Sequence, residues 1–170
     1  FLETNTLGTL NLLESVRNTQ KRIVVISTDE VYGSLDSGFA NEKFPLNPSS
    51  PYSASKASAD LLAISYFKTF GLDVVVTRCS NNYGPYQDSE KFIPTVIKSL
   101  KKDEPVEIYG DGKNVREWIH VDDHCEALLI ILIEGIAGEI YNIGSGSRFT
   151  NLEIVDLISK LMGLKKYEKK

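Results

Sequence analysis

The sequence of 170 residues predicts an α/β protein built around a doubly wound parallel sheet. Two short apolar runs, residues 23–26 and 74–76, are typical of strands that helices cover on both faces. Helical patterns at residues 2–16 and 51–70 precede these runs, so helix and strand alternate. This alternation is what a doubly wound sheet produces.

The first two helices follow from local signals. Leucines recur at helical spacing between positions 7 and 16. Ser50 suits the N-cap of the second helix, Pro51 suits its first turn, and Gly71 is expected to end it.

The second half of the chain is less regular. Residues 125–133 are apolar nearly all round, which predicts a buried helix capped by Asp122 or Asp123. Thr150 and Glu153 form a capping box for a last helix through residue 162. The other expected elements are a helix at 93–100, a short strand at 106–109, a turn at 110–112 and a strand at 139–143.

Composition excludes several functional classes. The net charge of −4 and the pI near 5.3 argue against a broad nucleic-acid or membrane surface. The longest apolar run, residues 127–133, is too short to cross a bilayer. Two cysteines are too few for a disulfide scaffold, so we expect a cytoplasmic protein. The lysines at 165, 166, 169 and 170 are expected to be solvated.

Tyr52 and Lys56 lie four residues apart at the start of a helix, so their side chains share one face. A free tyrosine titrates near pH ~10 and is a poor base at neutrality. A neighbouring ammonium can lower that pKa by roughly 1 to 3 pH units, and the helix dipole adds to the effect. The pair could therefore take a proton from a substrate hydroxyl, although spacing alone favours an exposed tyrosine beside a solvated lysine.

A second candidate group directly follows the first predicted strand. Thr28, Asp29 and Glu30 lie where ligands bind in open α/β sheets, at the carboxyl end of a strand. Adjacent carboxylates repel each other, which favours protonation of one of them. A proton donor beside a proton acceptor suits an elimination, whereas the alternative is a solvated acidic turn.

Six ordered motifs resemble the dTDP-glucose 4,6-dehydratases, which are extended short-chain dehydrogenases of the NAD-dependent epimerase/dehydratase family. The motifs are STDEVYG at 27–33, SPYSASK at 50–56, CSNNYGP at 79–85, IYGDG at 108–112, REWIHVD at 116–122 and YNIG at 141–144. The resemblance implies the C-terminal half of a Rossmann-type doubly wound sheet plus part of a smaller substrate-binding domain. It assigns residues 1–84 to NAD binding and residues 85–170 mainly to nucleotide-sugar binding, with some segments returning to the first domain.

The resemblance also implies a reaction: dTDP-glucose is oxidised at C4, loses water across C5 and C6, and receives the hydride back at C6. Tyr52 would be the base at C4, with Lys56 also contacting the nicotinamide ribose, and Thr28 would hydrogen-bond the C4 oxygen. Glu30 would remove the C5 hydrogen, and Asp29 would protonate the departing C6 hydroxyl.

Further positions would bind the cofactor or the substrate, and the family implies a homodimer through the helices that begin near Phe1 and Pro51. Without the resemblance, Arg116 reads as one half of a surface ion pair with Glu117; with it, its guanidinium suits a diphosphate. Thr4 and Asn82 would face NAD together with Tyr52 and Lys56. Thr28, Asn81, Lys91, Phe92, Glu107, Ile108, Tyr109, Arg116 and Asn142 would line the substrate site.

One motif of the family is missing, and several alternatives stay open. No Gly-rich phosphate loop follows a first strand, and the chain opens at Phe1 inside a helical pattern, so we expect a fragment that binds NAD poorly. His120, His124 and Cys125 lack recognisable zinc spacing, so no metal is expected. The alternatives are a UDP-sugar decarboxylase, a C4-epimerase, or a non-catalytic binding module of the same fold.

Overall fold

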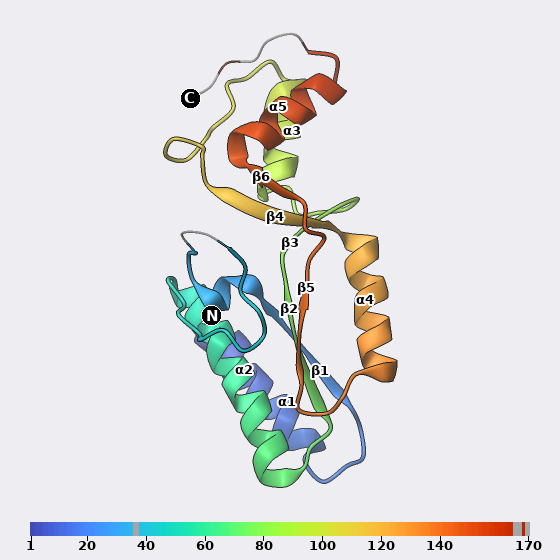
Figure 1. Cartoon of the computed structure of the whole chain (residues 1–170). Coiled ribbons are helices and arrows are strands. Elements are labelled where there is room, and N and C mark those ends of the chain that lie inside the picture. Colours follow the sequence, from blue (N-terminus) through green and yellow to red (C-terminus); the bar gives the residue numbers. More distant parts are fainter. Residues whose placement is uncertain (36–37, 165–167, 169–170) are drawn as a thin grey trace. The chain divides into compact units, whose positions relative to one another are not determined.

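The computed structural model describes residues 1–35, 38–164 and 168 (Figure 1). The basic residues expected to be solvated at 165, 166, 169 and 170 lie outside this described part. The chain forms two compact units. The first comprises Phe1–Ser80 and Asp123–Ile143, and the second comprises Asn81–Asp122 and Gly144–Lys170.

A three-stranded parallel sheet lies at the centre of the first unit, with the strand order β1-β2-β5. The register pairs Thr28 with Cys79 and Cys79 with Ile143, so the three strands reach the same edge at their carboxyl ends. The strands are β1 (Ile23–Thr28), β2 (Val74–Cys79) and β5 (Ile140–Ile143).

Helices cover both faces of this sheet, which confirms the doubly wound α/β prediction (Figure 1). Apolar side chains from α1, α2 and β2 form the main core, including Leu13, Ala63, Tyr66, Val74 and Val76. On one face lie α1 (Gly8–Val16), which continues a π-helical segment at Leu2–Leu7, and α2 (Pro51–Phe70); on the other lies α4 (Val121–Glu134).

The limits of α2 follow the sequence signals. Ser50 accepts a hydrogen bond from the Ser53 amide and so caps the helix, and Pro51 occupies its first position. Gly71 ends it with a φ of 68°, a left-handed conformation that glycine adopts without steric cost. These three predictions are confirmed.

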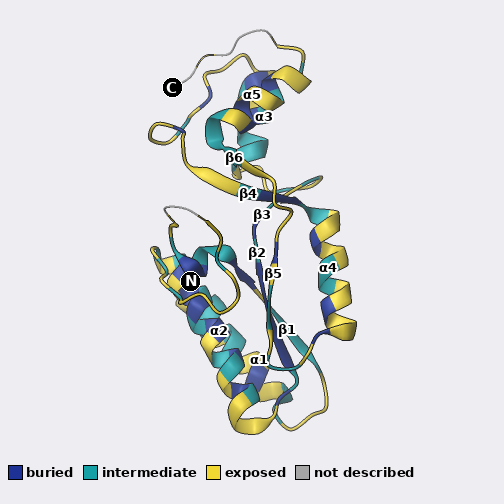
Figure 2. Cartoon of the chain, in the orientation of Figure 1, coloured by how far each residue is buried: buried dark blue, intermediate teal, exposed yellow. Residues whose placement is uncertain are grey.

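Two burial predictions are wrong. β1 is an edge strand in the described sheet, and Ile26 is 47% exposed, so only β2 has the fully buried pattern expected of both strands. In α4 only His124 and Ile131 are buried, whereas Ile133 is 75% exposed (Figure 2). The exposure of β1 and of α4 has the same reason: only one side of each element packs against described residues of this chain.

The start of α4 also differs from the prediction. The helix begins at Val121, so Asp122 and Asp123 lie in its first turn rather than at its cap. The Nδ1 atom of His120 accepts a hydrogen bond from the Asp122 amide at 3.3 Å. The His120 imidazole therefore caps the start of the helix, where the carboxylate of Asp122 or Asp123 was expected to do so.

The second unit contains a mixed sheet and two helices that pack on each other. Val96, Leu100, Val106 and Val155 form its core. Instead of a strand at 106–109, Val106 makes an isolated bridge, and its amide donates to the Glu168 carbonyl at 2.9 Å. The elements are β3 (Asn81–Tyr83), α3 (Phe92–Lys101), β4 (Val115–His120), β6 (Arg148–Thr150) and α5 (Asn151–Leu161), with β3 parallel and β6 antiparallel to β4.

Within the described ranges, no helix is both long and apolar enough to cross a membrane.

Candidate active site

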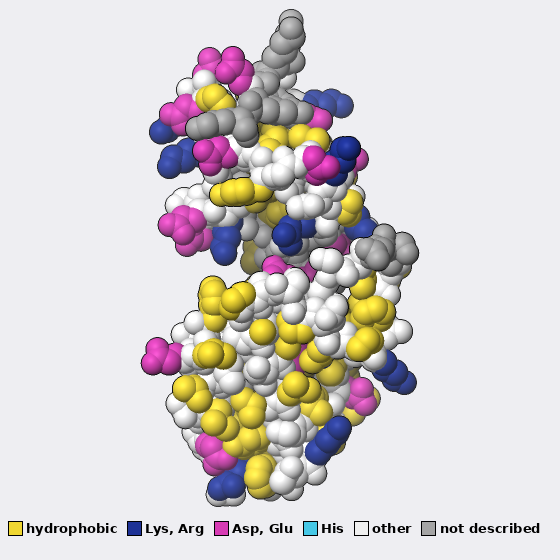
Figure 3. Space-filling view, turned by 90° about the vertical axis from the view of Figure 1, so that its left-hand side faces the viewer, with side chains coloured by type: hydrophobic (Ala, Val, Ile, Leu, Met, Phe, Trp, Pro, Cys, Tyr) yellow, Lys and Arg dark blue, Asp and Glu magenta, His cyan; other side chains and the backbone are white. Residues whose placement is uncertain are grey.

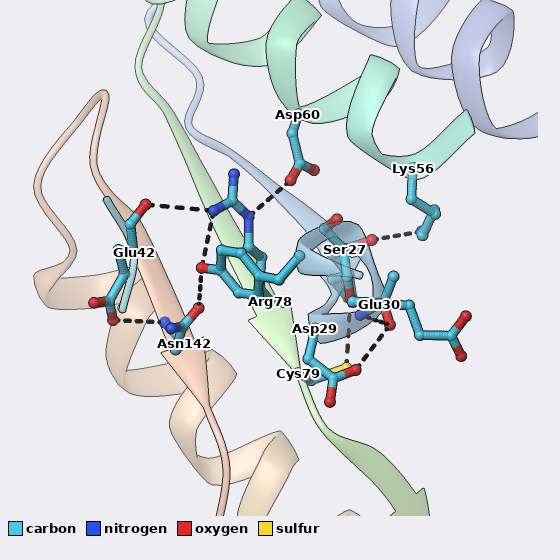
Figure 4. Close-up of polar contacts among 12 residues, drawn as sticks. Ser27, Asp29, Glu30, Glu42, Lys56, Asp60, Arg78, Cys79 and Asn142 are labelled. Atoms are coloured by element: carbon cyan, nitrogen blue, oxygen red, sulfur yellow. Dashed lines mark hydrogen bonds and ion pairs between the residues drawn. The ribbon is translucent and has the colours of Figure 1, made fainter. Parts of the chain in front are cut away.

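The segment that follows β1 forms a capped turn at the carboxyl edge of the sheet. Thr28 is the last residue of β1, and a 3₁₀ turn runs from Asp29 to Tyr32. The Thr28 hydroxyl oxygen accepts from the Glu30 amide at 3.3 Å and donates to Asp29 Oδ1 at 3.2 Å (Figure 4). One hydroxyl therefore sets the positions of both carboxylate-bearing residues.

Tyr52 and Lys56 come to the same edge from α2. Tyr52 lies in the first turn of the helix, and the Phe1 ring packs edge-on against it with centroids 5.6 Å apart. The Lys56 ammonium donates to the Ile26 carbonyl at 2.6 Å, which ties it to β1 (Figure 4). Lys56 thus reaches the strand that ends in Thr28.

The charges around Tyr52 differ from the expectation. Burial raises the pKa of the Tyr52 phenol, and negative charge on Glu30, Cys79 and Asp29 raises it further. The pKa of Tyr52 is thus raised, whereas the sequence predicted that it is lowered, because burial and these negative charges outweigh the expected effect of Lys56. The same result shows that the phenol lies within electrostatic reach of both carboxylates.

A cavity of about 260 Å³ runs beside β1 and α2. Thr4 and Lys56, both predicted to contact the cofactor, lie in its wall. A hydroxyl and an ammonium suit the hydroxyls of a ribose, so this part of the site fits that portion of NAD. The lining comprises Thr4, Asn5, Thr9, Leu12, Leu13, Ile23, Val24, Val25, Ile26, Ser27, Lys56, Ala59 and Asp60.

Asn142, which we expected at the substrate, is hydrogen-bonded within the first unit. Its Nδ2 donates to the Ala40 carbonyl at 3.0 Å, and its Oδ1 accepts from the Tyr32 hydroxyl at 2.7 Å. Its backbone amide donates to Glu42 Oε1 at 3.0 Å (Figure 4). These contacts hold the loop around residues 40–42 against β5, and the substrate role of Asn142 stays a prediction.

The second unit carries the remaining predicted site residues. Asn81 Nδ2 donates to the Glu117 carbonyl at 3.2 Å, which fixes its side chain on β4. Arg116 lies exposed on β4, while the Glu117 carboxylate pairs with Arg148 at 3.5 Å. The reading of Arg116 as the ion-pair partner of Glu117 is therefore wrong, because Glu117 pairs across the strand with β6.

Other predicted substrate residues of this unit lie around α3 and the turn before β4. Phe92, the first residue of α3, stacks on Trp118 with centroids 6.2 Å apart. Lys91 precedes that helix and is exposed, as are Glu107 and Tyr109. Ile108 is partly buried and packs against the core of the unit.

Asn82, the remaining predicted cofactor residue, belongs to the same unit. It lies in β3, pairs in register with Ile119, and its carbonyl accepts from Gln87 at 2.8 Å. The roles of the predicted residues of the second unit stay predictions. Among the described residues, no group of three or more His, Cys, Asp or Glu side chains is placed to hold a metal ion.

Sequence reasoning missed a buried polar cluster beside the turn at Asp29–Tyr32. It consists of Tyr32, Asp60 and Arg78, which are 4%, 1% and 3% exposed. A signal was present, because Arg78 is a charge in the strand Val74–Cys79, which begins with three valines, and buried charges require partners. Nothing in the spacing identified those partners.

The fold and the residues at the end of β1 together define a class of protein. A doubly wound sheet carries a Tyr-x-x-x-Lys pair on one helix and a Thr-Asp-Glu turn at the end of a strand. In agreement, the model of the NAD dependent epimerase/dehydratase family matches residues 1–144. The chain belongs to this family.

Relatives within the family confirm the resemblance to the dTDP-glucose 4,6-dehydratases. The chain is 51% identical to the dTDP-glucose 4,6-dehydratase of Streptomyces niveus over 164 residues, which cover 96% of the chain and 49% of that protein. The crystal structure of the Bacillus anthracis dTDP-glucose 4,6-dehydratase in complex with NAD superposes with a TM-score of 0.97 at 50% identity, covering 100% of this chain and 55% of that one.

A UDP-glucuronic acid 4-epimerase from Bacillus cereus is also similar, but less so. Its structure with UDP-glucuronic acid and NAD has a TM-score of 0.92 at 32% identity, with 98% of this chain and 53% of that chain covered. The chain spans about half the length of the curated relatives it matches.

Proposed function

We propose that this chain is part of an NAD-dependent dTDP-glucose 4,6-dehydratase, which forms dTDP-4-keto-6-deoxyglucose. The observation that supports this most directly is the pair of adjacent carboxylates, Asp29 and Glu30, which the Thr28 hydroxyl holds at the end of β1. An enzyme that only oxidises and reduces at C4 needs the tyrosine alone. An enzyme that also eliminates water needs a further acid and base.

Tyr52 accepts the proton of the C4 hydroxyl in the first step, and the Thr28 hydroxyl hydrogen-bonds the same oxygen. Thr4, Tyr52, Lys56 and Asn82 would hold the cofactor. NAD, when bound, supplies a hydride acceptor for C4, a donor for C6 and a cationic ring that lowers the pKa of a nearby phenol.

Glu30 and Asp29 act on the ketone that results. A carbonyl at C4 acidifies the hydrogen at C5, and the Glu30 carboxylate takes it as a proton. The electron pair forms the C5–C6 double bond as the C6–O bond breaks, and Asp29 protonates the departing hydroxyl so that water leaves. Thr28 hydrogen-bonds Asp29 and the Glu30 amide, which places the acid and the base side by side.

The second unit would bind the nucleotide portion of the substrate. Arg116 is exposed on β4, and its guanidinium suits the diphosphate because two of its N–H groups can reach two phosphate oxygens. Phe92 offers an aromatic ring that stacks on Trp118. Asn81, Lys91, Glu107, Ile108, Tyr109 and Asn142 complete the proposed set.

The full-length protein would be a cytoplasmic homodimer. Hydrophobic side chains gather on the face that α1 and α2 present (Figure 3). On these helices and the segment before them, Leu2, Leu7, Leu12 and Leu61 are each more than half exposed. Large exposed apolar groups of this kind mark interaction surfaces, and a helix bundle between two copies would cover them.

A UDP-sugar C4-epimerase or decarboxylase is the second candidate, supported by the similarity to the Bacillus cereus epimerase. The Asp29–Glu30 pair favours the dehydratase over an epimerase, because epimerisation has no elimination step.

The test is to incubate the full-length protein separately with dTDP-glucose, UDP-glucose and UDP-glucuronate and to identify the products by mass spectrometry and NMR. We expect loss of one water from dTDP-glucose and a new methyl signal at C6. An epimer of equal mass, or loss of carbon dioxide from UDP-glucuronate, would replace this proposal with the second candidate.

A further inference from the structure

Arg78 places a positive charge in the most buried strand of the protein. Its side chain is 3% exposed, and the preceding residues of β2 from Val74 to Thr77 are fully buried. Removing a guanidinium from water is unfavourable unless other groups neutralise it. Asp60 of α2, which is 1% exposed, does so through a hydrogen-bonded ion pair of 2.9 Å to Arg78 Nε (Figure 4).

The same guanidinium contacts the end of the catalytic turn. Arg78 Nη1 donates to the Tyr32 hydroxyl at 2.9 Å, and its Cζ lies 4.8 Å from the centroid of the Tyr32 ring. Nη1 also lies 3.4 Å from the Glu42 carbonyl. The Tyr32 hydroxyl in turn donates to Asn142 Oδ1 at 2.7 Å, so both its hydrogen-bonding roles are used.

These contacts connect the two halves of the acid–base machinery. Asp60 lies on α2 one turn beyond Lys56 and two turns beyond Tyr52. Tyr32 closes the 3₁₀ turn that begins with Asp29 and includes Glu30. One buried side chain on β2 therefore holds both the helix with the tyrosine base and the turn with the carboxylates.

The backbone at the far end of the turn, at Gly33, has little freedom to change its conformation. Gly33 adopts a φ of 77°, and a side chain there would overlap the Asn47 carbonyl. The Asn47 amide donates to the Val31 carbonyl at 2.9 Å. Thr28 links the beginning of the turn to β1, whereas Tyr32 attaches its far end to β2 and β5 through Arg78 and Asn142.

We propose that Arg78 is a positioning residue, which acts through Asp60 and Tyr32 to hold Tyr52 and the Asp29–Glu30 turn in register with each other. The proposal rests on the proposed function for the identity of the reaction. An ion pair that merely stabilised the fold could be replaced by apolar residues of similar volume without a catalytic defect. A positioning contact requires the planar fork of arginine, because the point charge of lysine cannot reach both partners in the same geometry.

The test uses full-length protein with Tyr32→Phe and Arg78→Lys, singly and together. Tyr32→Phe keeps the ring beneath the guanidinium and removes only the hydroxyl. In each single variant we expect kcat to fall about tenfold or more while KM stays nearly unchanged, because small displacements of reacting groups have large effects on rate. Solvent exchange at C5 should slow more than oxidation at C4, since the turn loses its anchor while Asp60 still holds α2.

Two further results separate positioning from general stability. The double variant should lose no more activity than the more impaired single variant, because both remove the same contact. Arg22→Met is the matched control, since Arg22 pairs with Asp73 at 3.0 Å at the opposite end of the sheet. It should lower the melting temperature without changing kcat.

Amide hydrogen exchange on the unliganded protein gives a readout that does not depend on the reaction. Tyr32→Phe should speed exchange in residues 29–33, and Arg22→Met should leave that segment unchanged. The proposal is overturned if Tyr32→Phe keeps both the wild-type amide exchange in residues 29–33 and the wild-type kcat. It is also overturned if the loss of kcat in the double variant equals the product of the losses in the two single variants. If the wild-type protein forms no 4-keto-6-deoxy sugar, the proposed function fails, and the exchange measurement still decides whether Tyr32 anchors the turn.

Discussion

The phenol of Tyr52 lies partly buried among acidic groups, and each of these influences favours its protonated form. Burial is the largest cause of the raised pKa, followed by the Glu30 charge. The acid and the base proposed for the elimination therefore also affect the group proposed for the oxidation. Mutation of either carboxylate is therefore expected to slow the elimination and, by removing a negative charge, to lower the pKa of the Tyr52 phenol.

Tyr52→Phe in the full-length protein should strongly slow oxidation at C4 and keep the fold. The ring remains to pack against Phe1, and only the hydroxyl group proposed to act as the base is lost. We expect a rate loss of roughly 10²- to 10⁴-fold, which is typical for removal of one acid–base group. Single-turnover absorbance of the reduced cofactor measures this, and circular dichroism checks the fold. Near-normal turnover would show that Tyr52 is not the base.

Glu30→Gln should separate elimination from oxidation. The amide cannot take the C5 proton, so deuterium incorporation at C5 of a supplied 4-keto sugar should slow by roughly 10²-fold or more. Loss of the Glu30 charge lowers the pKa of Tyr52, because that charge raises it in the structure. The pH profile of C4 oxidation should therefore shift towards lower pH.

Asp29→Asn is the companion variant for this experiment. It should keep C5 exchange and slow departure of the C6 hydroxyl, since an amide cannot donate a proton as a carboxylic acid does. If Glu30→Gln exchanges C5 at the wild-type rate while Asp29→Asn does not, the two roles are reversed.

At the scale of elements, helix caps set several of the boundaries. In α5, Thr150 accepts from the Glu153 amide at 3.1 Å, and the Glu153 carboxylate accepts from the Thr150 amide and hydroxyl. These bonds lower the pKa of Glu153 below its ordinary value of 4.5. Their contribution to stability is therefore present above that value and is lost as the pH falls through the folded pKa.

Thr150→Ala should destabilise the second unit by about 1 kcal/mol at neutral pH, as is usual for loss of a cap. The part of this advantage that comes from the bond between the Thr150 hydroxyl and the Glu153 carboxylate should be lost on acidification, so the difference between the two proteins should narrow below pH 4.5. Chemical unfolding followed by circular dichroism at several pH values measures the difference. Thr150→Ser keeps the hydroxyl and should behave as wild type; a constant difference at all pH values would contradict the capping role of Glu153.

At the scale of the whole molecule, we expect the 170 residues to supply only part of the contacts that NAD needs. Thr4 and Lys56 line the cavity beside β1, but no Gly-rich turn for the pyrophosphate occurs in the sequence. We expect the 170-residue chain to bind NAD very weakly, and the full-length protein to bind it tightly. Titration calorimetry on both measures the difference, and micromolar binding to the shorter chain would contradict this expectation.

Local patterns in the sequence were enough to predict most of the elements. The Ser50 cap, Pro51 and Gly71 define α2, because capping depends on residues within one helical turn. The Thr150–Glu153 box and the apolar run of β2 are equally local. By contrast, β3 (Asn81–Tyr83) has little intrinsic strand preference and forms through its pairing with β4.

The candidate site was predictable in part. The motifs located Tyr52, Lys56 and the Thr28–Glu30 turn, because each lies within a short stretch whose residues carry the signal. They did not show that burial and nearby negative charge raise the pKa of Tyr52, nor that Asn142 is hydrogen-bonded to Tyr32. Both facts depend on segments far apart in the sequence, which only the folded sheet brings together.

The sequence by itself determined the fold class, the position of α2 and the chemistry available at the end of β1, since all of these depend on neighbours along the chain. Tertiary structure decided the direction in which the pKa of Tyr52 shifts, the exposure of α4 and the partners of Arg78. Burial and electrostatic interaction act through space, so they are set by whatever packs nearby. A charge within an apolar strand shows that a partner must exist, but the fold determines that it is Asp60.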